Sequence, residues 1–205
     1  MRQSTTIRDD TTIRHLKKYA NRNPIHQLAL RRFFDRLAGE IAEMSPSTVL
    51  DFGCGEGLFL REIEARGAVL NDYLGVDLRE DALETARSLH PQYRFERSDL
   101  SRWNAPFTTF DLVVASQVLE HLPDPVGALE QLRDHCSGRL LLTVPTEPWF
   151  QIVNFLRGRH LARFGNHPEH VNRWSFTEFC SFVANHAEIV RAYRVFPFTV
   201  VVAEP

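Results

Sequence analysis

The chain has 205 residues, 43% of them hydrophobic, which suits one domain with a substantial buried core. Its formal net charge of −2 excludes the basic field that a whole nucleic-acid-binding domain usually carries, so we expect no DNA partner. Three widely separated cysteines, Cys54, Cys136 and Cys180, argue against a disulfide framework or a Cys-x-x-Cys zinc site. Because no apolar run approaches 18 residues and the first residues lack a signal-peptide pattern, we expect a cytoplasmic protein.

The first 44 residues are expected to form an N-terminal helical segment. Residues 1–12 are polar, 13–20 form a short basic amphipathic stretch, and Pro24 suits the first position of a longer helix. Apolar residues then recur at helical spacing to about Met44, and Pro46 ends the pattern. This helix is expected to pack against the edge of a sheet.

Val49–Phe52 predicts a short strand that runs into the glycine-rich turn Gly53-Cys54-Gly55-Glu56-Gly57, with a helix from about Leu58 to Gly67. Glycine has no Cβ, so a ligand can approach such a turn closely, and the N–H groups of the next helix favour negative charge there. A glycine turn can also close a strand–helix connection without a ligand. The glycines alone therefore do not decide the function.

The spacing of the glycines separates two families. A dinucleotide-binding turn has the pattern G-x-G-x-x-G, whose third glycine would fall on Leu58. Asp51 followed by G-x-G-x-G instead resembles motif I of class I S-adenosylmethionine-dependent methyltransferases. The resemblance implies S-adenosyl-L-methionine as cofactor and S-adenosyl-L-homocysteine as product. It also implies that Asp51, Gly53, Cys54 and Gly55 contact the cofactor.

The next two strands also lead to an acidic residue. Residues 73–78 contain Asp77 and residues 94–100 contain Asp99. Because ligands of open α/β sheets bind at the carboxyl ends of the strands, we expect Asp51, Asp77 and Asp99 to face one crevice. Asp77, with Leu78 beside it, is expected to accept hydrogen bonds from a ribose diol; the alternative is an acid that interacts only with the dipole of the following helix, residues 80–89.

Under the same resemblance, Asp99 is expected to accept a hydrogen bond from the adenine amino group and Leu100 to donate its backbone N–H to the ring. Further along, the segment F-D-L-V-V-A-S-Q-V-L-E-H-L, residues 110–122, resembles motif IV and the following segment of the small-molecule branch of the family. Ser116 and Gln117 are therefore also expected to contact the cofactor.

Strands and helices alternate along the rest of the chain. Phe110–Ser116 is an apolar run typical of a strand buried on both faces, a helix is expected over 126–136, and Gly138–Pro145 predicts the next strand. The last two strands, residues 189–196 and 198–203, resemble the closing antiparallel hairpin of the family. The expected fold is α/β: a single Rossmann-like domain over 45–205, with a seven-stranded mostly parallel sheet, a C-terminal antiparallel hairpin, and helices on both faces.

Residues 146–174 form a lid-like insertion that is longer than an ordinary connection. Its first half is apolar, whereas residues 157–163 are basic. Three interpretations stay open: a lid that walls an apolar substrate pocket, a contact with a membrane surface, or a contact with RNA. The N-terminal segment 1–44 is expected to cap the cofactor site from another side, with Tyr19 or Arg31 reaching its methionine end.

Histidines supply the candidate catalytic groups. His121, His167 and His170 are expected to converge with Glu120, and a capping box of Ser175 and Glu178 fixes the loop that precedes the next helix. His121 and His170 are the candidate general bases.

Ubiquinone-pathway O-methyltransferases, and the family that methylates small-RNA 3′ ends, carry E-x-x-E-H after the fourth strand and hold a divalent ion there. In this chain Gln117 stands in the place of the first glutamate, and a neutral amide is a poor ligand for a hard cation. A metal site at Glu120, His121 and His170 is therefore a minority hypothesis.

The sequence as a whole predicts an S-adenosylmethionine-dependent methyltransferase (EC 2.1.1 class) that acts on an oxygen or nitrogen atom of a small, partly apolar molecule. The alternatives are a metal-assisted methyltransferase of RNA ends or of a lipid or quinone, and a non-catalytic S-adenosylmethionine-binding partner protein.

Overall fold

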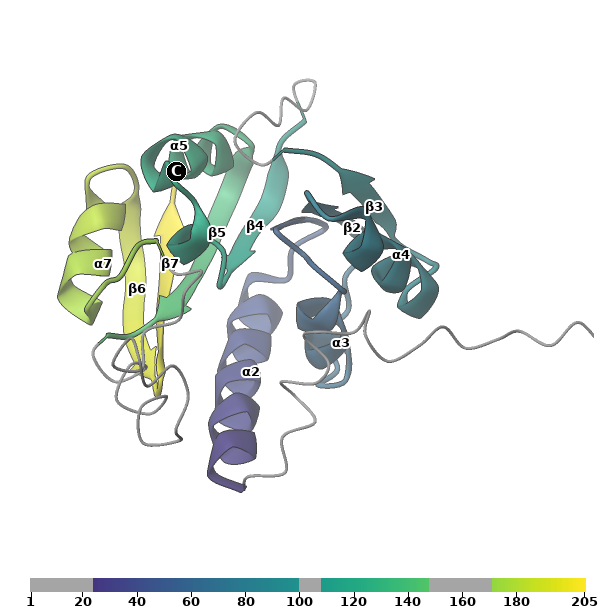
Figure 1. The fold of residues 1–205 in the computed structure, drawn as a ribbon, viewed down its shortest axis with the longest axis horizontal. Coiled ribbons are helices and arrows are strands. Elements are labelled where there is room, and N and C mark those ends of the chain that lie inside the picture. The colour runs from purple at the N-terminus through teal and green to yellow at the C-terminus, as the bar shows by residue number, and fades with distance from the viewer. Residues whose placement is uncertain (1–23, 100–107, 148–170) are drawn as a thin grey trace, which may run out of the picture.

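A computed structural model of the chain describes residues 24–99, 108–147 and 171–205, which form a seven-stranded sheet with helices on both faces (Figure 1). The strand order is β3-β2-β1-β4-β5-β7-β6. The strands are β1 (Thr48–Phe52), β2 (Asp72–Asp77), β3 (Arg94–Arg97), β4 (Phe110–Ser116), β5 (Cys136–Pro145), β6 (Glu188–Val195) and β7 (Phe198–Glu204). The predicted α/β fold class is confirmed.

Strands β1 to β6 all run in the same direction, and β7 alone runs antiparallel to its neighbours. β1 lies between β2 and β4, with Leu50 in register with Leu74 and Val113. β7 inserts antiparallel between β5 and β6, as the predicted C-terminal hairpin requires. All the parallel strands consequently present their carboxyl ends at one edge of the sheet, which we call the carboxyl edge.

One face of the sheet is covered by α2 (Pro24–Met44), α3 (Leu58–Glu64) and α4 (Glu80–Leu89) (Figure 1). Apolar side chains of α2, among them Phe33, Leu37 and Ile41, join a core cluster with residues of the central strands β1, β4, β5 and β7. α2 therefore packs on a face of the sheet; the expectation that it packs against the sheet edge was wrong. Its apolar positions recur over five turns, which makes a stripe wide enough to cover several strands.

The other face is covered by α5 (Pro125–Asp134) and α7 (Phe176–Ala184). Leu129 and Leu132 of α5 and Phe179 of α7 are almost completely buried against the sheet. The predicted capping box at the start of α7 is present: Ser175 Oγ accepts from Glu178 N, and the Glu178 side chain accepts from Ser175 N.

Two predicted boundaries were too long. β3 ends at Arg97, three residues before Leu100, because Ser98 N makes the last bond toward β2, to Asp77 O. α3 ends at Glu64, and the chain turns through Gly67, whose φ of 84° no helix can continue. Among the described residues, no helix has both the length and the apolar character needed to cross a membrane.

Candidate functional site

The glycine-rich turn follows β1 at the carboxyl edge. Gly53, Gly55 and Gly57 all have positive φ, of 79°, 54° and 74°. The need for glycine is strictest at Gly53, where a Cβ would lie 2.5 Å from Cγ2 of Val118, in the segment after β4. At Gly55 a Cβ would meet no described atom within 4 Å. The turn is thus closed on the β4 side at Gly53 and open at Gly55.

Asp77, at the end of β2, holds this turn in place. Its Oδ2 accepts a hydrogen bond from Gly55 N at 2.9 Å, and its Oδ1 accepts one from Arg79 N at 2.9 Å. The Asp77 side chain is only half-buried, so solvent or a ligand can still reach it. One carboxylate therefore joins the turn after β1 to the start of α4 at the predicted ligand crevice.

Asp51 occupies a different environment one strand away. It is 1% exposed, and its Oδ2 accepts a hydrogen bond of 2.6 Å from the Tyr73 hydroxyl, which is also buried. Burial raises the pKa of Asp51 to about 7, although the Tyr73 bond acts in the opposite direction and the charge of Asp77 adds to the increase. This carboxylate is enclosed in the fold beside Tyr73, and its contact with a cofactor stays a prediction.

Three other residues predicted to contact the cofactor are described by the structure, and they differ in how far they are buried. Cys54 is buried, and its sulfur packs so closely over Gly75 that a Cβ there would lie 2.8 Å away; burial raises the pKa of its thiol. Leu78 is 54% exposed, and Asp99 is exposed two residues beyond the end of β3. Leu100 lies outside the described residues.

Ser116 and Gln117 lie where β4 reaches the carboxyl edge. Ser116 Oγ is 3.0 Å from Thr143 Oγ1, and Gln117 Nε2 donates to the same oxygen at 3.1 Å. Gln117 has a φ of 62°, a left-handed conformation that costs energy for a residue with a Cβ. Such strain is often found at functional sites, so it supports a role for this turn without naming the role.

The segment after Gln117 brings His121 to the same edge. The 3-10 helix η1 (Leu119–His121) carries the buried carboxylate of Glu120 and the His121 imidazole, which is 37% exposed and whose Nε2 lies 3.9 Å from Glu120 Oε1. Backbone N–H groups of Val171 and Asn172 both donate to the Glu120 carbonyl. The last part of the 146–174 insertion is thereby fastened to the turn that carries His121.

Several predicted residues cannot be placed. His167, His170, Tyr19 and most of the insertion lie outside the described residues, so their expected convergence on His121 stays a prediction. Arg31 is exposed on α2. In the described part of the chain no group of three or more His, Cys, Asp or Glu side chains has the arrangement of a metal site. The minority metal hypothesis includes His170 and is not tested by that finding.

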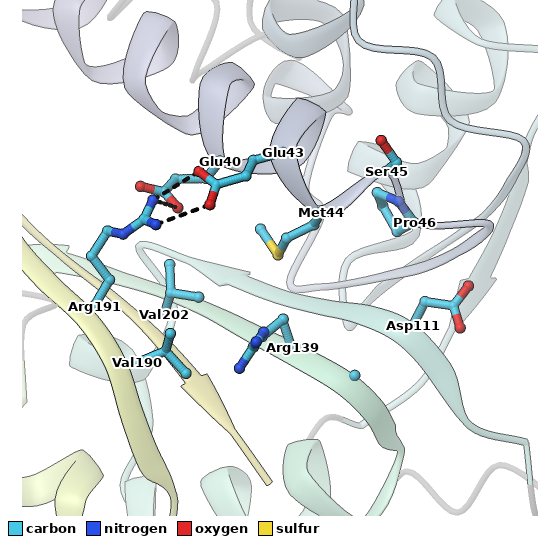
Figure 2. Close-up of a pocket in the computed structure, with 11 residues that line it drawn as sticks. Glu40, Glu43, Met44, Ser45, Pro46, Asp111, Arg139, Val190, Arg191 and Val202 are labelled. Atoms are coloured by element: carbon cyan, nitrogen blue, oxygen red, sulfur yellow. Dashed lines mark hydrogen bonds and ion pairs between the residues drawn. The ribbon is translucent and has the colours of Figure 1, made fainter.

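A pocket of about 430 Å³ lies at the opposite edge of the sheet, where β4 and β5 begin (Figure 2). Its charged side chains are engaged with one another or with backbone: Arg191 binds Glu40 and Glu43, Arg139 binds Glu204, and Asp111 accepts from the backbone N–H groups of Ser47 and Thr48. These ion pairs and hydrogen bonds hold the elements together at the amino-terminal ends of β4 and β5. The pocket therefore lies at the edge of the sheet opposite to the glycine turn.

One feature of the turn was missed by the sequence prediction. Glu56, between Gly55 and Gly57, is 2% exposed, and neither of its carboxylate oxygens has a hydrogen-bond partner among the described residues. Its position inside the glycine run was visible in the sequence. Its burial was not, because glutamate in a turn is usually solvated.

Comparison with known proteins agrees with this geometry. Residues 21–186 match the family described as "Methyltransferase domain". The chain is 30% identical over 115 residues to a ubiquinone biosynthesis O-methyltransferase of Nitrosomonas europaea, covering 52% of this chain and 46% of the relative. It is 33% identical over 127 residues to a trans-aconitate 2-methyltransferase of Azoarcus sp., covering 57% and 47%. The matched parts thus span about half the length of these curated relatives.

Solved structures show the same fold at low sequence identity. The methyltransferase domain of bacterial CtHen1 has a TM-score of 0.68 at 17% identity, covering 86% of this chain and all of that domain. Magnesium protoporphyrin IX methyltransferase from Synechocystis PCC 6803, solved with bound S-adenosylhomocysteine, has a TM-score of 0.65 at 17% identity, covering 88% of this chain and 87% of that one.

Proposed function

The chain belongs to the methyltransferase-domain family, and on this basis we propose that it transfers a methyl group from S-adenosylmethionine to an oxygen or nitrogen atom of a small molecule. The observation that carries the proposal is the glycine turn fastened to the Asp77 carboxylate at the carboxyl edge of the sheet. Two features prepare this place for a ligand: the open space at Gly55 and the half-buried side-chain carboxylate of Asp77 beside it.

The residues around the turn fit the groups that this cofactor carries. In the proposal, Asp77 accepts hydrogen bonds from the ribose hydroxyls, since two carboxylate oxygens match two adjacent hydroxyls. Asp99 and Leu100 bind the adenine, and the backbone of Gly53, Cys54 and Gly55 lies under the methionine part. Asp51, Leu78, Ser116 and Gln117 complete the predicted set. The cofactor supplies an activated methyl group on a sulfonium and leaves as S-adenosylhomocysteine.

The chain's own part in the reaction is alignment, exclusion of water and proton removal. A hydroxyl or protonated amine acceptor must lose a proton, and His121 is an exposed imidazole at the right edge of the sheet to accept it. His170 is the second candidate base. The buried carboxylate of Glu120 beside His121 would stabilise the imidazolium that forms.

A small-molecule acceptor is supported by two of the curated relatives, a ubiquinone biosynthesis O-methyltransferase and a trans-aconitate 2-methyltransferase. The insertion 146–174, which is apolar in its first half, is proposed to wall the acceptor's pocket. The proposal requires no metal.

The proposed cofactor site is tested by calorimetric titration of S-adenosylmethionine into the wild type and the variants Asp77→Ala and Asp72→Ala. Both aspartates lie on β2, but Asp72 is at the other end of the strand, paired with Arg94. Asp77→Ala is expected to weaken binding by about 1.5–3 kcal/mol, the range for charge-assisted hydrogen bonds. Asp72→Ala should bind like the wild type. Unchanged affinity in Asp77→Ala would remove the ribose assignment, and no binding by the wild type would refute the proposed function.

A further inference from the structure

The hydrogen bonds of the fold do not explain why the carboxylate of Glu56 is buried. The side chain is 2% exposed, and both oxygens lack a hydrogen-bond partner among the described residues. Burying an ionised carboxylate without a partner is costly, so sequences usually avoid it or supply a cation. Here the cost falls inside the turn on which the proposed ligand site depends.

Arg79, a cation near Glu56, is already engaged with another partner. The pKa of Arg79 is raised mainly by its hydrogen bond to Asp81, and the charges of Asp77 and Glu56 add smaller contributions. The guanidinium of Arg79 makes two hydrogen bonds to Asp81, at 3.2 and 2.6 Å. Glu56 is therefore near a positive charge without being paired to it.

The two acids at the neighbouring strand ends, Asp51 and Asp77, are less suited to bind a further cation. Asp51 already accepts a hydrogen bond from Tyr73, and burial raises its pKa to about 7, so near neutral pH much of it is uncharged. Asp77 already accepts from two backbone N–H groups. In the described part of the turn, Glu56 is the acid whose acceptor capacity is unused.

The turn is open at Gly55, the residue before Glu56, whereas at Gly57 an added Cβ would lie 3.1 Å from the His90 ring. Gly55 and Gly57 flank Glu56, both at positive φ, and at Gly55 no described atom would meet an added Cβ within 4 Å. We propose that Glu56 binds the α-ammonium group of the methionine part of S-adenosylmethionine, and so selects a cofactor with an amino-acid tail. This inference rests on the proposed function and adds a residue that the motif resemblance did not assign.

The test compares two ligands that differ in this tail. S-adenosylhomocysteine carries the ammonium group, whereas 5′-methylthioadenosine has the same nucleoside and thioether without the amino acid. Calorimetric titrations of both ligands would be run on the wild type and on Glu56→Gln, Glu56→Asp and Glu188→Gln. Glu188 is exposed at the start of β6, on the far edge of the sheet, so its variant removes an equal charge elsewhere.

Glu56→Gln is expected to lower the affinity for S-adenosylhomocysteine about 10- to 100-fold, the equivalent of one charge-assisted hydrogen bond. Its affinity for 5′-methylthioadenosine should stay within about twofold of the wild type, since that ligand has no ammonium group. Glu56→Asp should retain part of the affinity for S-adenosylhomocysteine, and Glu188→Gln all of it. Because no partner is lost in the free protein, the Tm of Glu56→Gln without ligand should equal or exceed that of the wild type.

Unchanged binding of S-adenosylhomocysteine by Glu56→Gln would overturn the inference. An equal loss for both ligands, accompanied by a lower Tm of the free protein, would also overturn it and mark Glu56 as structural. Failure of the wild type to bind either ligand would instead refute the proposed function, and this inference with it.

Discussion

Replacing Asp51 by Asn is expected to stabilise the protein at alkaline pH while leaving it little changed in acid. The Asp51 carboxyl is buried beside Tyr73, and burial raises its pKa from 3.8 to about 7. A group whose pKa is higher in the folded than in the unfolded state binds more protons when folded, so the free energy of unfolding falls as pH rises between the two values. Asparagine keeps an oxygen that can accept the Tyr73 hydrogen bond but cannot ionise.

The size of the effect follows from the two pKa values. At about 1.4 kcal/mol per pKa unit, the difference between 3.8 and about 7 corresponds to about 4 kcal/mol, lost by the wild type as the pH rises through about 7. A little under half of this is already lost at pH 5, so between pH 5 and pH 8 the wild type should lose about 2–3 kcal/mol relative to Asp51→Asn.

Urea unfolding of both proteins at pH 5, 6, 7 and 8, followed by circular dichroism, measures this difference. The gap in unfolding free energy should widen steadily with pH and level off above pH 7.5. Parallel pH dependences of the two proteins would refute the assignment of a raised pKa to Asp51. Asp111→Asn is a matched control, because Asp111 is exposed and its side chain can still accept from the backbone N–H groups of Ser47 and Thr48.

Three further predictions concern the turn, the base and the metal. Gly53→Ala should lower the Tm by several degrees and abolish binding of S-adenosylmethionine, because its Cβ would lie 2.5 Å from Val118. The control is Gly67→Ala, since Gly67 is also left-handed but has no described atom near the position of an added Cβ, and this variant should keep the affinity. Equal affinity in both variants would contradict the role of the turn. His121→Ala or His170→Ala should lower turnover while leaving calorimetric affinity for the cofactor nearly intact, and full activity in both would eliminate the histidine base. Methyl transfer should continue in the presence of a chelator; loss of activity that magnesium or manganese restores would favour the metal-assisted alternative.

The order and type of the secondary-structure elements could be predicted because local pattern and tertiary packing agree. The apolar run of β4 and the amphipathic period of α4 have the predicted bounds, Phe110–Ser116 and 80–89. The capping box of α7 was also predicted, since it depends on two residues three apart. The early end of β3 could not be predicted, because it depends on where the ladder with β2 stops.

Within the candidate site, the acids at the strand ends could be predicted as a group, but their individual environments could not. Asp51 and Asp77 follow the same pattern in sequence, yet one is enclosed by Tyr73 and the other bridges two backbone N–H groups. That difference arises from contacts between residues 22 positions apart, which no local motif encodes. The burial of Glu56 was missed because a glutamate in a turn is usually solvated.

The most direct measurement is a crystal structure of the protein grown with S-adenosylhomocysteine. The ligand is expected at the carboxyl edge, with its ribose hydroxyls on Asp77 and its amino-acid tail over Gly53, Gly55 and Glu56. Ligand density in the pocket of Figure 2 at the opposite edge, or a ribose that makes no contact with Asp77, would contradict the proposed site.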